Sequence, residues 1–166
     1  MPRILRENAQ PTDEGWSSWE KAIVPDKPLG EDYETRGDGE KGVMCKEIRK
    51  VLPNVMRRCG IYEWQARRTL VDQQDELVVY VGSTCRAKPG SLRRRILEYC
   101  MNGSHKSAII NTALERGYEL WVRVKTSNGT RVGAEEMENE LLEEYNYAWN
   151  LRNNRKTSIR QILPAP

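Results

Sequence analysis

Glu138 is an acidic side chain whose position is not explained by solubility alone. Residues 134–150, AEEMENELLEEYNYAWN, are rich in helix formers and contain no Gly or Pro, which predicts a helix. On the helical wheel, Glu138 falls inside the apolar stripe, beside Leu141 and Tyr145. A carboxylate turned toward a core is costly unless it is paired, protonated or bound to a metal ion. The pattern leaves open a satisfied core glutamate, a glutamate at the ragged edge of the stripe, or a carboxylate with a special role such as metal binding.

Arg95 is a second candidate, at the edge of another apolar stripe. SLRRRILEYC, residues 91–100, opens on a serine that can cap a helix, and Arg95 precedes Tyr99 by one turn. Tyr62 and Tyr80 stand on predicted strands that begin or end with glycine. Packing is the alternative for each of them, because an arginine stem covers apolar surface and a strand tyrosine can leave its hydroxyl at the rim.

A small sheet must hold the two tyrosines. GIYEWQA, residues 60–66, is a predicted strand, and the continuously apolar LVVYVG, residues 77–82, predicts a central strand buried on both faces. The polar residues 67–76 between them are predicted to form a connecting loop. Residues 118–125 alternate like a half-buried strand, and residues 104–117 predict another helix. The element order predicts an α+β fold, a small sheet flanked by helices.

The N-terminal third is expected to be an extension of residues 1–56, packed on a core domain of residues 57–166. Trp16 and Trp19 require burial, and the residues after them are rich in glycine and acids, as in turns. VMCKEIRKVL, residues 43–52, predicts a short helix that ends before a proline.

The composition indicates one soluble domain. A chain of 166 residues is long enough to bury a core. No run approaches the roughly 20 apolar residues of a membrane span, and the N-terminus lacks a signal-peptide pattern, so we expect an intracellular protein. The four cysteines form no CxxC pair and the chain has one histidine, which argues against a zinc site. Free thiols or one disulfide remain possible.

Positive charge is clustered, although the net charge of +3 is too small to indicate nucleic acid by itself. The clusters favour phosphate contacts or form solvated faces. His105 and Lys106 open a predicted helix, where they could bind phosphate, with an exposed loop histidine as the alternative. The basic clusters are Arg57-Arg58, Arg67-Arg68, Arg93 to Arg95 and Arg152 to Arg160.

Together these elements resemble the GIY-YIG nuclease family over residues 60–150. The paired signature of that family is matched by GIY, ending at Tyr62, and by YVG, beginning at Tyr80. In the family an arginine follows the second motif on a helix, four residues before a Tyr or His. RILEY gives that position to Arg95, with Tyr99 in the Tyr/His place.

The same family places a metal-binding glutamate twelve residues before a terminal asparagine. Counted back from Asn150, that position is Glu138, the residue already singled out by the helical wheel. The resemblance implies a mainly antiparallel three-stranded sheet flanked by helices. It also implies a DNA endonuclease that hydrolyses phosphodiester bonds with Mg²⁺ or Mn²⁺ and uses no organic cofactor.

The resemblance assigns a role to each motif position. Glu138 would bind the metal ion as a hard oxygen ligand, and Arg95 would stabilise charge on the phosphate. Tyr62 would act as the base, with its pKa lowered by Arg95 or the metal, or would orient the attacking water. Tyr80 would position the water or the phosphate. Asn150 would brace the site by hydrogen bonds.

Further residues are expected to contact the substrate, duplex or branched DNA, without reading its sequence. No recognition element is evident in the sequence, and the oligomeric state is not indicated. The candidate substrate-binding residues are Gly82, Arg93, His105 and Lys106.

A closer similarity links the chain to the plant effector of transcription proteins. It is carried by LLEEYNYAWN before Asn150 and by the tryptophan-containing segment that leads through Leu52-Pro53 to GIYEW. The cysteine-rich repeats of that group are missing. The similarity implies an alternative function, a DNA-binding transcription regulator with weak or no cleavage, located in the nucleus rather than the cytoplasm.

Overall fold

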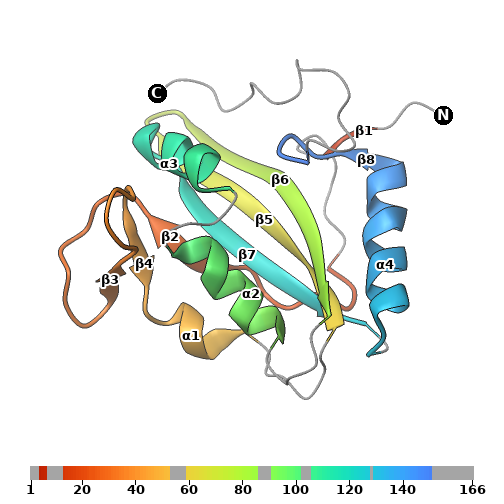
Figure 1. Ribbon diagram of the computed structural model, residues 1–166. Helices are drawn as coiled ribbons and strands as arrows, with labels where there is room; N and C mark the ends of the chain where they lie inside the picture. Colours follow the sequence, from red (N-terminus) through yellow and green to blue (C-terminus); the bar gives the residue numbers. More distant parts are fainter. Residues whose placement is uncertain are drawn as a thin grey trace.

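One antiparallel sheet organises the part of the chain described by the computed structural model, residues 4–6, 13–52, 59–85, 91–101, 106–127 and 129–150 (Figure 1). Its strands are β2 (Glu20–Val24), β3 (Tyr33–Thr35), β4 (Val43–Cys45), β5 (Cys59–Leu70), β6 (Gln73–Cys85) and β7 (Glu119–Thr126). They run in the spatial order β3-β4-β2-β7-β5-β6. A short parallel pair joins β1 (Ile4–Leu5) to β8 (Tyr145–Asn146).

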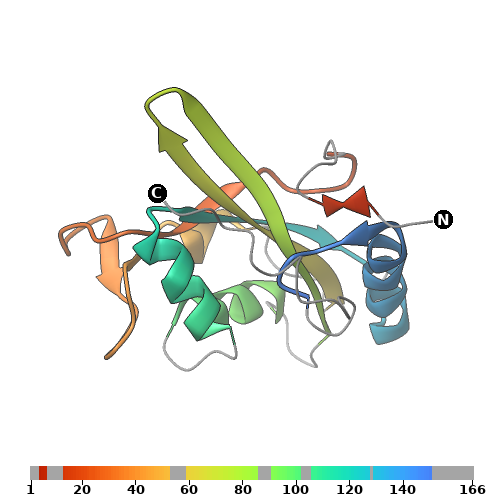
Figure 2. The same ribbon diagram turned by 90° about the horizontal axis from the view of Figure 1, so that it is seen from above.

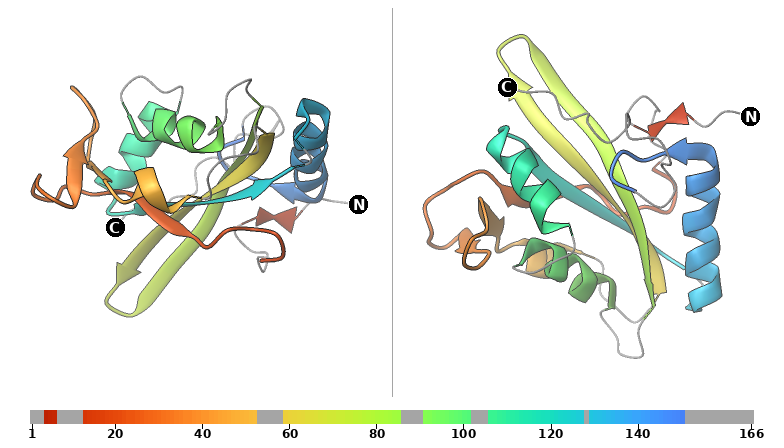
Figure 3. Two further views of the ribbon diagram at one scale, coloured as in Figure 1. Left: turned by 90° about the horizontal axis from the view of Figure 1, so that it is seen from below. Right: turned by 45° about the horizontal axis from the view of Figure 1, so that its top comes forward.

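Helices cover both faces of this sheet. Seen from above in Figure 2, α2 and α3 lie on one side, where their apolar side chains form the main core with β5 and β7. Figure 3 shows α4 apart from them, beside the β6 edge, where Leu142 packs with Val78, Val81 and Tyr147. Within the described ranges no helix has the length and apolar character of a membrane span. The helices are α1 (Ile48–Val51), α2 (Ser91–Cys100), α3 (Ser107–Glu115) and α4 (Arg131–Glu144).

The α+β class is confirmed, but the predicted sheet of three strands is too small. The expected antiparallel core of β7, β5 and β6 is present. The other edge of β7 is paired by β2, which brings β4 and β3 into the same sheet. Strands from the N-terminal third therefore extend the sheet itself. Residues 43–52 form β4 and the short α1, so the prediction of one helix there is wrong in its first half.

The strand that carries YVG lies at the edge of the sheet, so the prediction of a central strand is wrong. Its apolar residues are buried on both faces because the main core covers Val79 and the α4 cluster covers Val81. Its outer edge is covered too, since the Trp149 N–H donates to the Val79 carbonyl at 2.8 Å. A strand that is buried on every side needs apolar residues throughout. An edge strand covered in this way therefore has the same sequence pattern as a central strand.

The residues predicted as a loop, 67–76, instead extend β5 and β6 into one long hairpin. Pairing continues to Leu70 and Gln73, whereas β7 pairs with β5 only as far as Arg67. The end of the hairpin therefore projects beyond the sheet (Figure 2). Its polar side chains pair across the strands, as in the 3.2 Å ion pair of Arg68 with Asp75. Most of these residues are exposed, whereas Arg68 and Asp75 are buried as a pair, so their polarity did not mark the absence of a strand.

The cysteines divide into a bonded pair and two buried thiols. Cys59 and Cys85 face each other across β5 and β6 and form a disulfide. Cys45 and Cys100 are free and buried. Burial raises the pKa of the Cys45 thiol to about 11 and that of the Cys100 thiol to about 12, so both stay protonated at neutral pH.

Candidate active site

Three tyrosines meet on the face of the sheet that α2 covers. Tyr62 pairs in register with Gly82, and Trp64 with Tyr80, so the two motif tyrosines point to the same face. Tyr99 joins them from α2: its Oη lies 2.8 Å from the Oη of Tyr62 and donates to that of Tyr80 at 3.3 Å. The cluster joins both motif strands to the helix that carries Arg95.

The motif glycines allow this close packing. The ring of Tyr62 lies over Gly82, where a Cβ atom would stand 2.5 Å from its Cζ. A Cβ atom at Gly60 would stand 2.5 Å from the Lys125 carbonyl oxygen and 2.7 Å from Leu92 Cδ1. Gly82, expected to bind substrate, is therefore the floor beneath the Tyr62 ring.

Replacing Gly82 by alanine is expected to displace the Tyr62 ring. The added methyl group overpacks a buried contact, which should lower the free energy of unfolding by about 1–3 kcal/mol. Urea denaturation checks this result. Gly30→Ala is the matched control, because nothing lies within 4 Å of a Cβ atom at Gly30. Equal stability of the two variants would contradict the close contact.

Arg95 is bound into the tyrosine cluster. Its Nη2 donates to Tyr99 Oη at 3.2 Å, its Nε to Tyr62 Oη at 3.4 Å, and its Nη1 to Glu98 at 3.2 Å. The guanidinium carbon lies 4.8 Å from the centroid of the Tyr99 ring. Burial opposes the charge, but the phenol oxygens of Tyr62 and Tyr99 outweigh it and raise the pKa of Arg95. The cluster thus holds a permanent, half-buried cation.

Burial controls the protonation of Tyr62. Desolvation, helped by nearby Tyr80, raises the pKa of the Tyr62 phenol to about 12, although Tyr99 and Arg95 pull it down. A base at this position would need a pKa below the ordinary tyrosine value. Arg95 does not lower the pKa of Tyr62 that far. The pKa of Tyr99 is raised as well, first by burial. Of the two roles that the sequence left open for Tyr62, orienting a water molecule fits a neutral phenol.

The raised pKa of Tyr62 should appear in the pH dependence of stability. An unfolded tyrosine ionises near pH 10, whereas the folded phenol keeps its proton up to about pH 12. The unfolded state then binds fewer protons, so the free energy of unfolding falls as pH rises through this window, by about 1.4 kcal/mol per pH unit from this group. Urea denaturation at several pH values measures the slope. Tyr62→Phe should make it shallower, and an unchanged slope would contradict the assignment.

Glu138 lies on the other side of the edge strand. Ser83 Oγ donates to Glu138 Oε2 at 2.7 Å, and Glu138 is half-buried. Ser83 shares the face of Val81, toward α4, because side chains alternate along a strand. The neighbouring Gly82 supports Tyr62 on the opposite face, and consecutive Cα atoms are about 3.8 Å apart. Glu138 and the tyrosine cluster thus flank the same short stretch of β6.

This carboxylate fits a hard divalent cation. Glu138 is half-buried on α4, and the Ser83 hydroxyl orients its carboxylate, as outer hydrogen bonds orient metal ligands. Mg²⁺ commonly takes one or two protein carboxylates and keeps several waters. In the described ranges no three His, Cys, Asp or Glu side chains form a metal-binding group.

Asn150 covers the outer edge of β6 next to Trp149. Its Oδ1 accepts from the Val81 N–H at 3.0 Å, and its Nδ2 donates to the Val81 carbonyl at 2.8 Å. The amide side chain thereby imitates one residue of a neighbouring strand, next to the backbone bond of Trp149. It holds the backbone immediately before Gly82 and Ser83 in place.

Lys106 lies beside the tyrosines. Its Nζ donates to the Trp149 carbonyl at 2.8 Å and stands 4.9 Å from the centroid of the Tyr80 ring. Burial lowers its pKa. A small cavity of about 10 Å³ opens there, lined by Trp64, Tyr80, Tyr99, Lys106, Ile110 and Trp149. Lys106 thus brings a second positive charge close to the cluster.

One of the expected substrate contacts does not join this group. Arg93 donates to the carbonyls of Leu52 at 2.8 Å and Lys50 at 3.4 Å, so it binds the end of α1 instead. His105 lies outside the described residues. The structure therefore gathers Arg95 with the tyrosines, places Lys106 beside them, and puts Glu138 and Asn150 on the edge strand.

Sequence reasoning missed Ser83. The serine directly follows the YVG motif on β6, and that adjacency was the available signal, because the residue after a motif glycine lies on the same short stretch of strand. Its partner Glu138 lies 55 residues away. No local pattern indicates such a pairing.

A sheet that presents the GIY and YVG tyrosines to an arginine-bearing helix defines a GIY-YIG type of domain. The family model for GIY-YIG domain-containing proteins matches residues 16–163, so the chain belongs to this family. Members of the family are nucleases that act on DNA. The match includes strands β2 to β4 of the N-terminal third. No curated protein and no solved structure shows a significant match.

Proposed function

We propose that this chain is a divalent-metal-dependent endonuclease that hydrolyses DNA phosphodiester bonds. The observation that carries the proposal is the Arg95 guanidinium, held by the hydroxyls of Tyr62 and Tyr99. A fixed cation with hydroxyl groups around it suits a phosphate that gains negative charge in the transition state. The family membership supports nuclease chemistry, and the metal requirement is part of the proposal.

The residues divide the work of hydrolysis. Arg95 neutralises charge on the non-bridging phosphate oxygens. Tyr62, a neutral phenol, orients the water that attacks phosphorus, and Tyr80 helps to position the phosphate. The bond from the water oxygen to phosphorus forms as the bond to the leaving oxygen breaks; the water gives up its proton to solvent, and the leaving oxygen takes a proton from solvent. Preorganised groups of this kind act mainly by positioning and by charge stabilisation.

Glu138 would hold Mg²⁺ or Mn²⁺ at the edge of β6, with Ser83 orienting its carboxylate. When bound, the ion would supply further charge relief to the phosphate. Glu138 lies on the far side of β6 from the tyrosines, so substrate would approach over the strand edge at Gly82 and Ser83. This edge defines where the scissile phosphate is expected to lie.

Nicking of supercoiled plasmid DNA tests the proposal. Wild-type protein should convert the plasmid to open circles with Mg²⁺ or Mn²⁺ and stop on addition of EDTA. Tight DNA binding without metal-dependent cleavage would overturn it. That result would favour the alternative of a nuclear DNA-binding regulator, similar to the plant effector of transcription proteins.

A further inference from the structure

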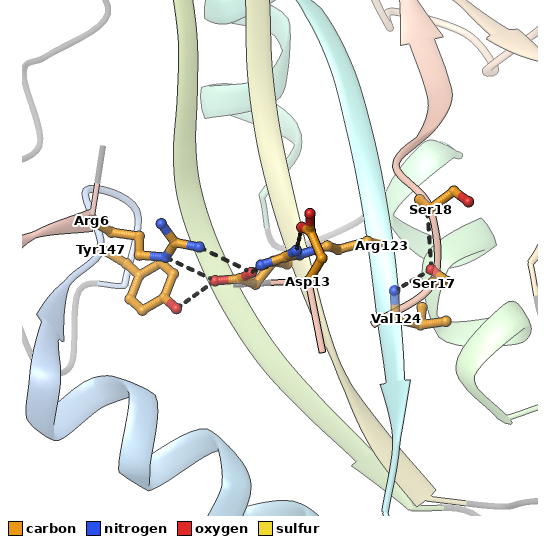
Figure 4. A network of polar contacts seen from close by, with 8 residues as sticks. Arg6, Asp13, Ser17, Ser18, Arg123, Val124 and Tyr147 are labelled. Carbon is orange, nitrogen blue, oxygen red and sulfur yellow. Dashed lines mark hydrogen bonds and ion pairs between the residues drawn. The ribbon is translucent and has the colours of Figure 1, made fainter. Parts of the chain in front are cut away.

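Glu63 is a fully buried carboxylate that the proposed mechanism does not use. It follows Tyr62 on β5 and therefore points to the opposite face of the sheet. Arg123 donates to its Oε1 from Nη2 at 2.6 Å and from Nε at 3.0 Å. Arg6 Nε donates to its Oε2 at 3.1 Å, and the Tyr147 hydroxyl at 2.5 Å. Figure 4 shows these side chains converging from separate segments.

The partners of Glu63 are themselves out of solvent. Arg6 is 3% exposed, Arg123 1% and Tyr147 0%. Burial and the Glu63 carboxylate raise the pKa of Tyr147, so its hydroxyl is a permanent donor. Arg123 also reaches Asp13 at 3.1 Å. A buried charge is costly when it loses its partners, so the side chains around Glu63 are held in place. We call Glu63, Arg6, Arg123 and Tyr147 the junction.

The junction ties the end of α4 to the motif strand. Tyr147 stands three residues before Asn150, and its carbonyl accepts from the Asn150 N–H at 3.1 Å. Asn150 in turn holds both backbone groups of Val81 on β6. Arg6 follows β1, which pairs with β8 directly after α4. One chain of contacts thus runs from Glu63 to the edge strand between the tyrosines and Glu138.

We infer that Glu63 is a positioning residue for the active site, acting through Tyr147 on the segment that ends at Asn150. This inference rests on the proposed nuclease function. Loss of the Tyr147 hydroxyl should loosen residues 147–150 and release the β6 edge. The tyrosine cluster and Glu138 would then lose their fixed positions relative to each other, although the substitution contacts neither of them.

Tyr147→Phe tests the inference, because it removes only the hydroxyl from the junction. Tyr118→Phe is the matched control: its hydroxyl also meets a buried carboxylate, Asp75 at 3.5 Å, in the projecting part of the hairpin. The single-turnover cleavage rate of Tyr147→Phe should fall about ten-fold or more, with DNA affinity within about two-fold of wild type. Tyr118→Phe should retain the wild-type rate even where its melting temperature falls.

Hydrogen exchange gives a readout independent of activity. The Val81 amide, bonded to Asn150, should lose protection about ten-fold or more in Tyr147→Phe and keep it in Tyr118→Phe. Unchanged Val81 protection and an unchanged rate in Tyr147→Phe would overturn the positioning role, whatever the loss of stability. A wild type that fails to cut would overturn the proposed function instead, and Val81 protection would still decide the role of Glu63.

Discussion

Glu138→Gln should abolish metal-dependent nicking while the protein stays folded. The amide keeps the size of the side chain and still accepts the bond from Ser83, but it removes the charge that would hold Mg²⁺. A metal ion contributes several kcal/mol of charge stabilisation, so the cleavage rate should fall by about a thousand-fold or more. Plasmid nicking over a range of Mg²⁺ and Mn²⁺ concentrations measures the loss.

The control for this variant lies on the same helix. Glu140 is exposed on α4, so Glu140→Gln removes one charge without altering the edge of β6. Its nicking rate should match wild type, and both variants should melt at similar temperatures. If Glu138→Gln nicked plasmid DNA at the wild-type rate, Glu138 would have no part in the mechanism.

Arg95→Lys should produce the second largest loss of activity. Lysine keeps the positive charge but lacks the planar fork with which Arg95 reaches Tyr62 and Tyr99 at the same time. Removing one preorganised donor of this kind costs about 100- to 1000-fold in rate. The single-turnover rate constant should fall by that factor, and DNA affinity should fall much less.

The neighbouring arginine supplies the comparison. Arg94 is exposed on α2, so Arg94→Lys should leave the rate unchanged. If Arg95→Lys cleaved DNA as fast as wild type, the positive charge alone would matter at this position. The geometry of the guanidinium would then have no part in catalysis.

Local sequence patterns predicted the parts of the site that depend on periodicity. The strand around Tyr62, the helix with Arg95 one turn before Tyr99, and the placement of Glu138 on the buried side of α4 all follow from spacings within one element. Such spacings determine which side chains share a face, because strand and helix geometry is the same in every fold. The grouping of Arg95 with Tyr99 was readable for this reason.

Local patterns failed where the neighbours of an element decide its environment. The apolar run around Tyr80 indicated burial, but burial arises equally from sheet neighbours and from α4 with Trp149. Residues 67–76 are mostly polar because most of them project into solvent, and Arg68 and Asp75 compensate each other in a buried ion pair, yet both arms of the segment have strand partners. The pairing of β2 with β7, which enlarges the sheet, joins residues about a hundred positions apart along the chain, as in Glu20 with Val122.

By itself, the sequence determined the family, the motif strands and the faces on which Tyr62, Arg95 and Glu138 lie. Only the tertiary structure decided which long-range partners meet. Glu63 stands between an aromatic pair as if it faced solvent, yet it is buried by Arg6, Arg123 and Tyr147. Periodicity reports how a side chain is oriented within its own element. The partner that compensates its charge is set by packing between distant segments, which no local spacing records.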